Sequence, residues 1–291
     1  MLNISLAAER LWTVWGLPVS NAYITTWLVM ALILVLSWLA TRKMSVIPGN
    51  IQLIAEMIVG GLYDFFGAIA GKHIKQFFPI VASLFLFILA ANWVGLLPGV
   101  GTIGFYRSEK PQTAVVETAP ETAVQKTQEE PSAEVAAGTK GTGETDAAAG
   151  EHGKTEFVPL FRAATADLNM TLALAIVSVI AMQYYGFLNL GGHYLGRFIN
   201  FKDPIQFSVG LLELVSDISK VISFAFRLFG NIFAGEVLLA VIAFLMPFIV
   251  PLPFLFMELF VGLIQAYVFS MLALVFISQA TISHHGGEEH H

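Results

Sequence analysis

Residues 223–236 read SFAFRLFGNIFAGE and lie inside an apolar segment that extends from residue 207 to residue 245. Arg227 stands near the middle of this segment, and no acidic residue lies within a helical turn of it. A guanidinium keeps its charge in a protein. Placing it in a bilayer costs between about 3 and more than 10 kcal/mol. Such a charge indicates a functional site, whose partner is water, another helix or another subunit.

The composition predicts a membrane protein. Apolar residues make up 56% of the 291 residues and charged residues only 12%, and the mean hydropathy is +0.72. Soluble globular chains are less apolar and carry about 25% charged residues. The chain has no cysteine, which excludes disulfides and thiolate metal sites. We therefore predict an all-α integral membrane protein.

Five apolar runs are long enough to cross a bilayer, which takes roughly 20 residues. They cover residues 23–40, 77–97, 168–190, 207–245 and 254–283. Residues 48–71 instead alternate between apolar and polar side chains, which is typical of an interfacial amphipathic helix. The first run has no A-x-A cleavage site, so we expect a retained span rather than a signal peptide.

The last two runs are too long to cross upright. Residues 207–245 would form a helix of about 58 Å, whereas the hydrocarbon core is about 30 Å thick. A tilt within the usual range of about 0 to 40° does not absorb this excess. We therefore expect a helix that either breaks midway or lies steeply inclined in the membrane.

Basic residues predict the orientation. The loop between the first two crossings carries four Lys and Arg residues against two acidic ones, and the loop after residue 190 carries two against one. Loops rich in Lys and Arg are cytoplasmic. We therefore expect the amino terminus outside and the carboxyl terminus in the cytoplasm.

The polar insert at residues 105–160 divides the chain. It is acidic, and hardly any aromatic residue lies between residues 112 and 154, so we expect it to be disordered and extracytoplasmic. An amino-terminal membrane region (residues 1–104) precedes it. A second membrane region (residues 161–283), which contains Arg227, and a polar tail (residues 284–291) follow. The role of the insert stays open.

Helical spacing arranges the polar residues around Arg227. At about 100° per residue, Ser223, Arg227 and Asn231 lie on one stripe. Glu236 is nine residues beyond Arg227 and is therefore expected on the opposite side of the helix. In the last run, Glu258 and Gln265 are seven residues apart and share a face. The pattern suits a path in which carboxylates relay protons to solvent while a permanent cation blocks their direct passage.

Here the sequence resembles a known family. The stretch SFAFRLFGNIFAGE is similar to the signature of the a subunit of rotary F-type ATP synthases, and ELFVGLIQAYVF at residues 258–269 resembles the family's last helix. Supporting matches are TADLNMTLALA at 165–175, NWVGLLP at 92–98 and PGNIQLIAE at 48–56. Their order and spacing extend the resemblance over nearly the whole chain outside the insert and the termini.

The resemblance implies roles for five residues in the last two spans. Arg227 matches the essential arginine that faces the ring of c subunits, and Asn231 lies one turn further along. Gln265 matches the glutamine that approaches this arginine from the last helix. Glu236 and Glu258 match two half-channel positions, which many bacterial members fill with Glu and His. With Glu at both, which of them is protonated at rest stays open.

At the outer mouth of the channel, the resemblance implies roles for Asp167 and Asn169. The alternative for this pair is helix capping, a common task for Asp at a helix start, and both roles are compatible. The family's last two helices form an inclined hairpin against the ring.

The implied function is translocation of an ion, expected to be the proton, through two aqueous half-channels that couple the gradient to rotation and ATP synthesis. The expected partners are the c-ring, b-type peripheral stalk subunits, the rest of the ATP synthase complex and the lipid of a bacterial inner membrane. The sequence indicates no catalytic site, cofactor, metal or nucleic-acid partner.

Other readings use the same residues. A secondary transporter could bind an anionic solute at Arg227, but it would require an internal repeat that the sequence lacks. An intramembrane hydrolase would need H-E-x-x-H or G-x-S-x-G, and neither occurs. Arg227 could be a structural cation, and Glu236 and Glu258 could be protonated hydrogen-bond donors between helices. We interpret Glu213, Asp217 and Lys220 as an interface or mouth network without a catalytic role.

Overall fold

The computed structural model describes residues 10–14, 17–42, 44–97, 100, 103–108, 155–191, 194, 204–246 and 249–281. Residues 109–154 of the insert, which were predicted to be disordered, and the polar tail at residues 284–291 lie outside these residues. Packing divides the chain into two units: Met1–Gly104 together with Pro159–His291, and Phe105–Val158.

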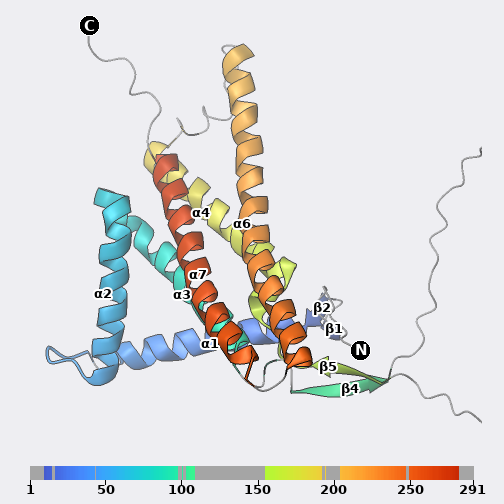
Figure 1. Ribbon diagram of the computed structural model, residues 1–291. Coiled ribbons are helices and arrows are strands. Elements are labelled where there is room, and N and C mark those ends of the chain that lie inside the picture. Colours follow the sequence, from blue (N-terminus) through green and yellow to red (C-terminus); the bar gives the residue numbers. More distant parts are fainter. Residues whose placement is uncertain are drawn as a thin grey trace, which may run out of the picture. The chain divides into compact units, whose positions relative to one another are not determined.

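The first unit is built from six α-helices within the described residues (Figure 1). They are α1 (Asn21–Thr41), α2 (Asn50–Ala70), α3 (Ile74–Gly95), α4 (Leu168–Leu190), α6 (Pro204–Leu245) and α7 (Pro251–Thr281). Two 3-10 turns, η1 (Gly71–His73) and η2 (Ala164–Ala166), precede α3 and α4. Five helical stretches are long and apolar enough to cross a membrane. The predicted helical membrane fold is therefore confirmed.

The segment predicted to be interfacial forms a helix of its own. α2 ends at Ala70 and is followed by Gly71, whose φ of 54° is a conformation that glycine adopts without strain. The short turn η1 then separates α2 from the apolar helix α3. By length and composition, residues 50–95 also qualify as one continuous apolar stretch, so the interfacial position of α2 stays a prediction.

The described residues also contain two short two-stranded sheets, which were not predicted from the sequence. β1 (Arg10–Val14) pairs antiparallel with β2 (Leu17–Ser20), with Trp12 opposite Val19 and Val14 opposite Leu17. β4 (Gly104–Ser108) pairs with β5 (Thr155–Pro159), so the two ends of the insert are hydrogen-bonded to each other. Two-stranded sheets of this length give a weak periodic signal beside long apolar runs.

α6 is a continuous helix of 42 residues. The alternative in which it breaks midway is therefore wrong. At 1.5 Å per residue it is about 63 Å long, which is about twice the thickness of a hydrocarbon core. A continuous helix of this length must be inclined in a bilayer or extend beyond it. The inclination of α6 and α7 in the membrane stays a prediction.

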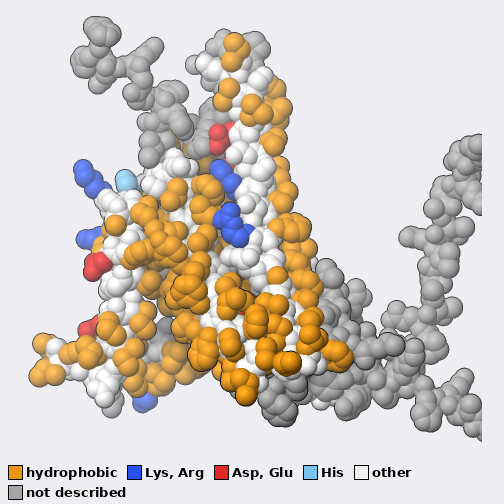
Figure 2. All heavy atoms as spheres, in the orientation of Figure 1, with side chains coloured by type: hydrophobic (Ala, Val, Ile, Leu, Met, Phe, Trp, Pro, Cys, Tyr) orange, Lys and Arg blue, Asp and Glu red, His pale blue; other side chains and the backbone are white. Residues whose placement is uncertain are grey.

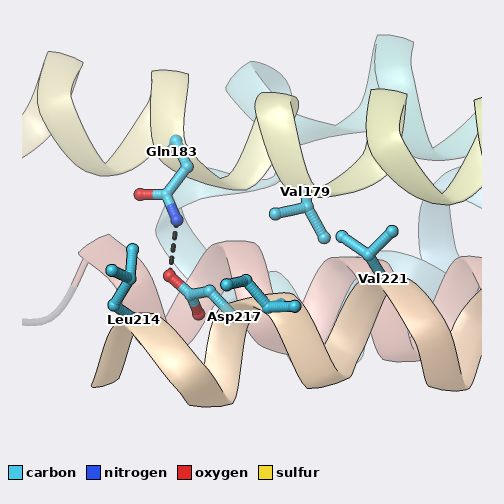
Figure 3. A pocket seen from close by; sticks show the side chains of 6 residues that line it. Val179, Gln183, Leu214, Asp217 and Val221 are labelled. Atoms are coloured by element: carbon cyan, nitrogen blue, oxygen red, sulfur yellow. Dashed lines mark hydrogen bonds between the residues drawn. The ribbon is translucent and has the colours of Figure 1, made fainter. Parts of the chain in front are cut away.

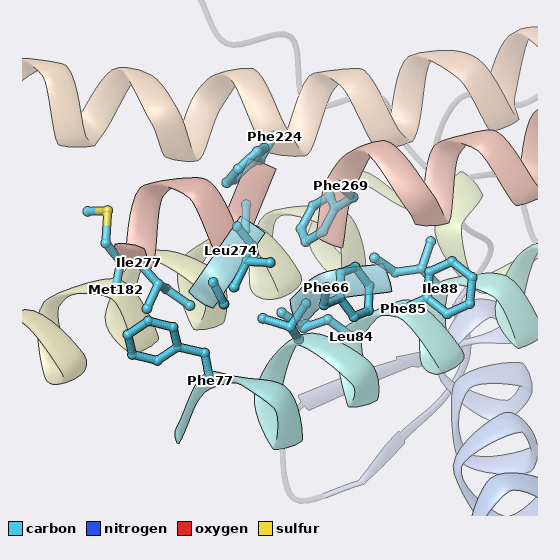
Figure 4. Packing of buried hydrophobic residues seen from close by; sticks show 14 of the residues in the cluster. Phe66, Phe77, Leu84, Phe85, Ile88, Met182, Phe224, Phe269, Leu274 and Ile277 are labelled. Atoms are coloured by element: carbon cyan, nitrogen blue, oxygen red, sulfur yellow. The ribbon is translucent and has the colours of Figure 1, made fainter. Parts of the chain in front are cut away.

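The core lies where α3, α4 and α6 meet α7 (Figure 4). Phe224 of α6 packs on Phe269 of α7 with ring centroids 4.9 Å apart, and Phe77 of α3 and Met182 of α4 belong to the same cluster. Apolar side chains also cover much of the outer surface (Figure 2). That surface suits lipid, because hydrocarbon solvates apolar side chains without cost.

Candidate functional site

Arg227 lies on the exposed side of α6. Phe224, Ala225 and Leu228 turn inward and are almost fully buried, so the helical period places Arg227 outward together with Ser223 and Asn231. Among the described residues, Arg227 has no hydrogen bond or ion pair. The chain therefore presents a permanent charge at its surface without a described counter-ion.

One turn beyond Arg227, the two long helices are joined by an amide pair. Asn231 donates a hydrogen bond from Nδ2 to Oε1 of Gln265 on α7, at 2.6 Å. Gln265 is only 3% exposed, and its Nε2 has no partner among the described residues. The buried amide therefore keeps a donor that no described residue satisfies.

Glu258 of α7 is buried against the backbone of α6. Its carboxyl group lies so close to Gly235 that a Cβ atom added at that glycine would overlap it. The side chain is 5% exposed, and its Oε1 has no hydrogen-bond partner among the described residues. Glycine at position 235 therefore provides the space in which this carboxyl group sits.

Glu236 pairs with an arginine that the sequence analysis did not single out. Its Oε2 lies 3.5 Å from Nη2 of Arg162, whose side chain is largely buried. The spacing argument placed Glu236 away from Arg227, and the structure agrees, since the cation beside Glu236 is Arg162. A clue was present in the sequence, because Arg162 lies five residues before Asp167 at the start of an apolar span.

Asp167 and Asn169 meet at the start of α4. The backbone N–H of Asn169 donates to Oδ1 of Asp167 at 3.0 Å, so Asp167 is the helix cap that the alternative interpretation expected. Asp167 is buried and also accepts a 3.5 Å hydrogen bond from the hydroxyl of Ser20. The side chain of Asn169 is exposed. Capping leaves a role at a channel mouth open.

Asn92 of α3 connects this region to α7. It accepts a hydrogen bond from Thr165 Oγ1 at 2.8 Å and donates one to the backbone carbonyl of Gly262 at 3.1 Å. The indole N–H of Trp93 donates to the carbonyl of Leu259 at 3.2 Å. These bonds fix the backbone of α7 between Glu258 and Gln265. The sequence analysis had used Asn92 only as part of a motif.

Asp217 of α6 and Gln183 of α4 belong to a second group of polar side chains, which lies nearer the amino-terminal end of α6 than Arg227 does (Figure 3). Lys220 Nζ is 2.6 Å from Oδ1 of Asp217, and Gln183 of α4 donates to Oδ2 of Asp217 at 2.5 Å. A cavity of about 380 Å³ opens beside this group. It is lined by Val179, Gln183, Leu214, Asp217, Ile218 and Val221.

Comparison with known proteins identifies the family. The family described as ATP synthase A chain matches residues 23–278. Similar proteins named ATP synthase subunit a come from Trichlorobacter lovleyi and Citrifermentans bemidjiense, each 31% identical to this chain. The first match covers 89% of this chain and 86% of the relative, and the second covers 91% and 89%.

A third protein of that name, from Legionella pneumophila, is 27% identical over 95% of this chain and 93% of its own length. All candidate site residues therefore lie within residues 23–278, the part of the chain that the family matches. This chain belongs to the ATP synthase A chain family.

Proposed function

We propose that Arg227 is the fixed charge past which a ring of c subunits turns, and that the residues around it form the ion path. Membership of the family makes the chain a multi-pass membrane subunit that translocates protons within an F-type ATP synthase. The proposal rests mainly on one observation: Arg227 is exposed in the middle of a 42-residue apolar helix, without a described partner. A charge in that place needs a partner from another subunit or from water.

The chemistry of Arg227 is electrostatic. A fixed cation lowers the pKa of a nearby carboxylic acid, because it stabilises the ionised form. A ring carboxylate that reaches Arg227 therefore gives up its proton, and the guanidinium holds the charge until the site moves on. A protonated ring site is neutral and can rotate into lipid. The driving energy is about 2.3 kcal/mol per charge for each 100 mV.

We assign the outer half-channel to the carboxylates of Glu236 and Glu258. Glu236 is nine residues, or about 14 Å along the helix, from Arg227. Glu236 is partly exposed and pairs with Arg162, whereas Glu258 is buried against Gly235. Two carboxylates in such different surroundings can pass a proton inward in steps. Asp167 and Asn169 are placed at the mouth of this path.

The last step toward the ring is assigned to Gln265 and Asn231. Gln265 lies two turns beyond Glu258 on α7, and its hydrogen bond to Asn231 brings the α7 amide within one turn of Arg227 on α6. Ser223 lies one turn to the other side of Arg227 and is also exposed. We assign Ser223 a supporting polar role on the face that the ring passes.

The proposed partners and location are inferred from the exposed side of α6 and from the charge of the loops. The c-ring is placed on the exposed side of α6, and b-type stalk subunits hold the chain against the turning ring. From the excess of Lys and Arg in the loops we infer that the amino terminus lies outside and the carboxyl terminus in the cytoplasm. We propose the inner membrane of a bacterial cell as the location. A transporter that binds an anionic solute at Arg227 has no support from the family.

The decisive experiment replaces Arg227 with Ala in the assembled complex. We expect gradient-driven ATP synthesis to be lost while the complex still assembles. Arg42→Ala is the matched control, because Arg42 follows α1 and stacks its guanidinium on Trp38 at 4.8 Å, far along the chain from the site. Synthesis at the native rate in the Arg227→Ala complex, with the c-ring present, would overturn the proposal.

A further inference from the structure

α6 carries two basic residues, and the structure treats them differently. Lys220 and Arg227 are seven residues apart, which places them about 20° apart around the helix and about 10 Å apart along it. They therefore belong to the same side of α6. Arg227 is exposed and has no described polar partner, whereas the side chain of Lys220 is only 17% exposed.

The side chain of Lys220 lies toward the side of α6 that packs against α7. Its ammonium group forms an ion pair with Asp217, one turn earlier, with 2.6 Å between Nζ and Oδ1. The same group lies 5.1 Å from the centre of the Phe276 ring on α7, within the range of a cation–π contact. Both interactions hold the charge between helices.

Asp217 is itself held in place from α4. Gln183 donates to its second oxygen, Oδ2, at 2.5 Å (Figure 3). Tyr194 in turn donates its hydroxyl to Oε1 of Gln183 at 2.5 Å. The ring of Tyr194 lies against Gly186, where an added Cβ atom would come within 2.5 Å of it. Both oxygens of a carboxylate that is 6% exposed therefore have partners. An arrangement this complete fixes where Asp217 points.

We propose that Asp217 is a positioning residue that neutralises and restrains Lys220, so that Arg227 is the free cation on the side of α6 that faces the ring. The inference rests on the proposed function. A second free ammonium about 10 Å from Arg227 along α6 would also stabilise an ionised ring carboxylate, and it would hold that carboxylate at the wrong position. In a surrounding of low dielectric constant, such a competing charge acts strongly over about 10 Å.

The test separates charge from packing by compensation. Asp217→Asn keeps the shape of the side chain and leaves Lys220 charged without its counter-ion. We expect the rate of gradient-driven ATP synthesis to fall about tenfold. The double variant Asp217→Asn with Lys220→Gln removes both charges, and we expect it to recover to within about twofold of the native rate. Ser219→Ala is the control, because among the described residues this exposed hydroxyl donates only to the carbonyl of Val215.

A second measurement distinguishes the proposed role from poor assembly. For a tenfold loss in a step that moves one charge, the membrane potential at which synthesis reaches half its maximum should rise by about 60 mV. A complex that is only less abundant has a lower maximal rate at an unchanged potential. Co-purification of the c-ring measures assembly in each variant.

The outcomes are distinct. The inference is supported if the double variant recovers the synthesis rate and the shift in membrane potential is reversed. This holds even if the single variant Asp217→Asn assembles poorly. A native rate in Asp217→Asn overturns it, and so does a double variant that is no better than the single one. Arg227→Ala is measured in parallel. If Arg227→Ala keeps the native rate, the proposed function fails, whereas failed rescue beside an inactive Arg227→Ala overturns only the inference.

Discussion

The carboxyl group of Glu258 on α7 rests directly on Gly235 of α6, in a space that a single methyl group would fill. This contact joins the two long helices near Glu236, which follows Gly235 in the chain and is paired with Arg162. The position of a buried carboxylate is therefore set by the absence of a side chain on the neighbouring helix.

Gly235→Ala should displace the Glu258 carboxyl group. Alanine in a helix is favoured over glycine by roughly 0.5–1 kcal/mol, so a loss would come from the overlap with Glu258. We expect synthesis to fall about tenfold or more. Gly60→Ala is the control, because a Cβ there meets nothing within 4 Å. Equal rates in the two variants would show that the fit of Glu258 is unimportant.

Arg162→Ala should impair the path by leaving Glu236 without its cation. An uncompensated charge that is partly buried is costly, so we expect a loss of about tenfold in synthesis. Glu236→Gln added to Arg162→Ala should cost little more, because the pair acts as one unit. The measurement is a double-mutant cycle on synthesis rates. Independent, multiplying effects of the two substitutions would contradict the coupling.

Asn231→Ala and Gln265→Ala should show a coupling between α6 and α7. A hydrogen bond contributes about 0.5–1.5 kcal/mol to stability. We expect an interaction of that size in a double-mutant cycle on the thermal inactivation of the complex. The hydrogen bond would be absent in the assembled enzyme if the two substitutions simply added.

Asn92→Ala should destabilise the chain rather than change its chemistry. The substitution removes the added hydrogen bond to the Gly262 carbonyl, which keeps its helical bond, and leaves the buried Thr165 hydroxyl without its partner, at a cost of about 1–3 kcal/mol for that hydroxyl. We expect faster thermal inactivation with a normal rate per assembled complex at low temperature. Ser83→Ala serves as control, because in the part of the chain that the structure describes that exposed hydroxyl donates only to the Ile80 carbonyl. Equal inactivation of both variants would contradict the bridging role.

The sequence predicted the helices closely. α4 was predicted at residues 168–190 and spans Leu168–Leu190, and α1 begins and ends within two residues of the prediction. The reason is physical: a segment in lipid must satisfy its own backbone hydrogen bonds, so an apolar run of sufficient length forms a helix. The shared side of Ser223, Arg227 and Asn231 followed from helical period alone.

The polar partnerships were predicted less well. Three of the observed contacts join residues that lie far apart in the chain: Arg162 with Glu236, Asn92 with Gly262, and Gln183 with Asp217. A single sequence carries no periodic signal for such pairs. The sequence analysis treated Asp217 and Lys220 as a network of the interface or mouth, but it had no means to see that α4 holds Asp217 in place.

The sequence by itself determined that this chain is a bundle of membrane helices with one uncompensated arginine in their midst, because apolar length and helical period are local properties. Only the tertiary structure decided which cation is free. Whether a charge is paired depends on what packs beside it, and Lys220 meets Asp217 and Phe276 while Arg227 meets no described counter-charge.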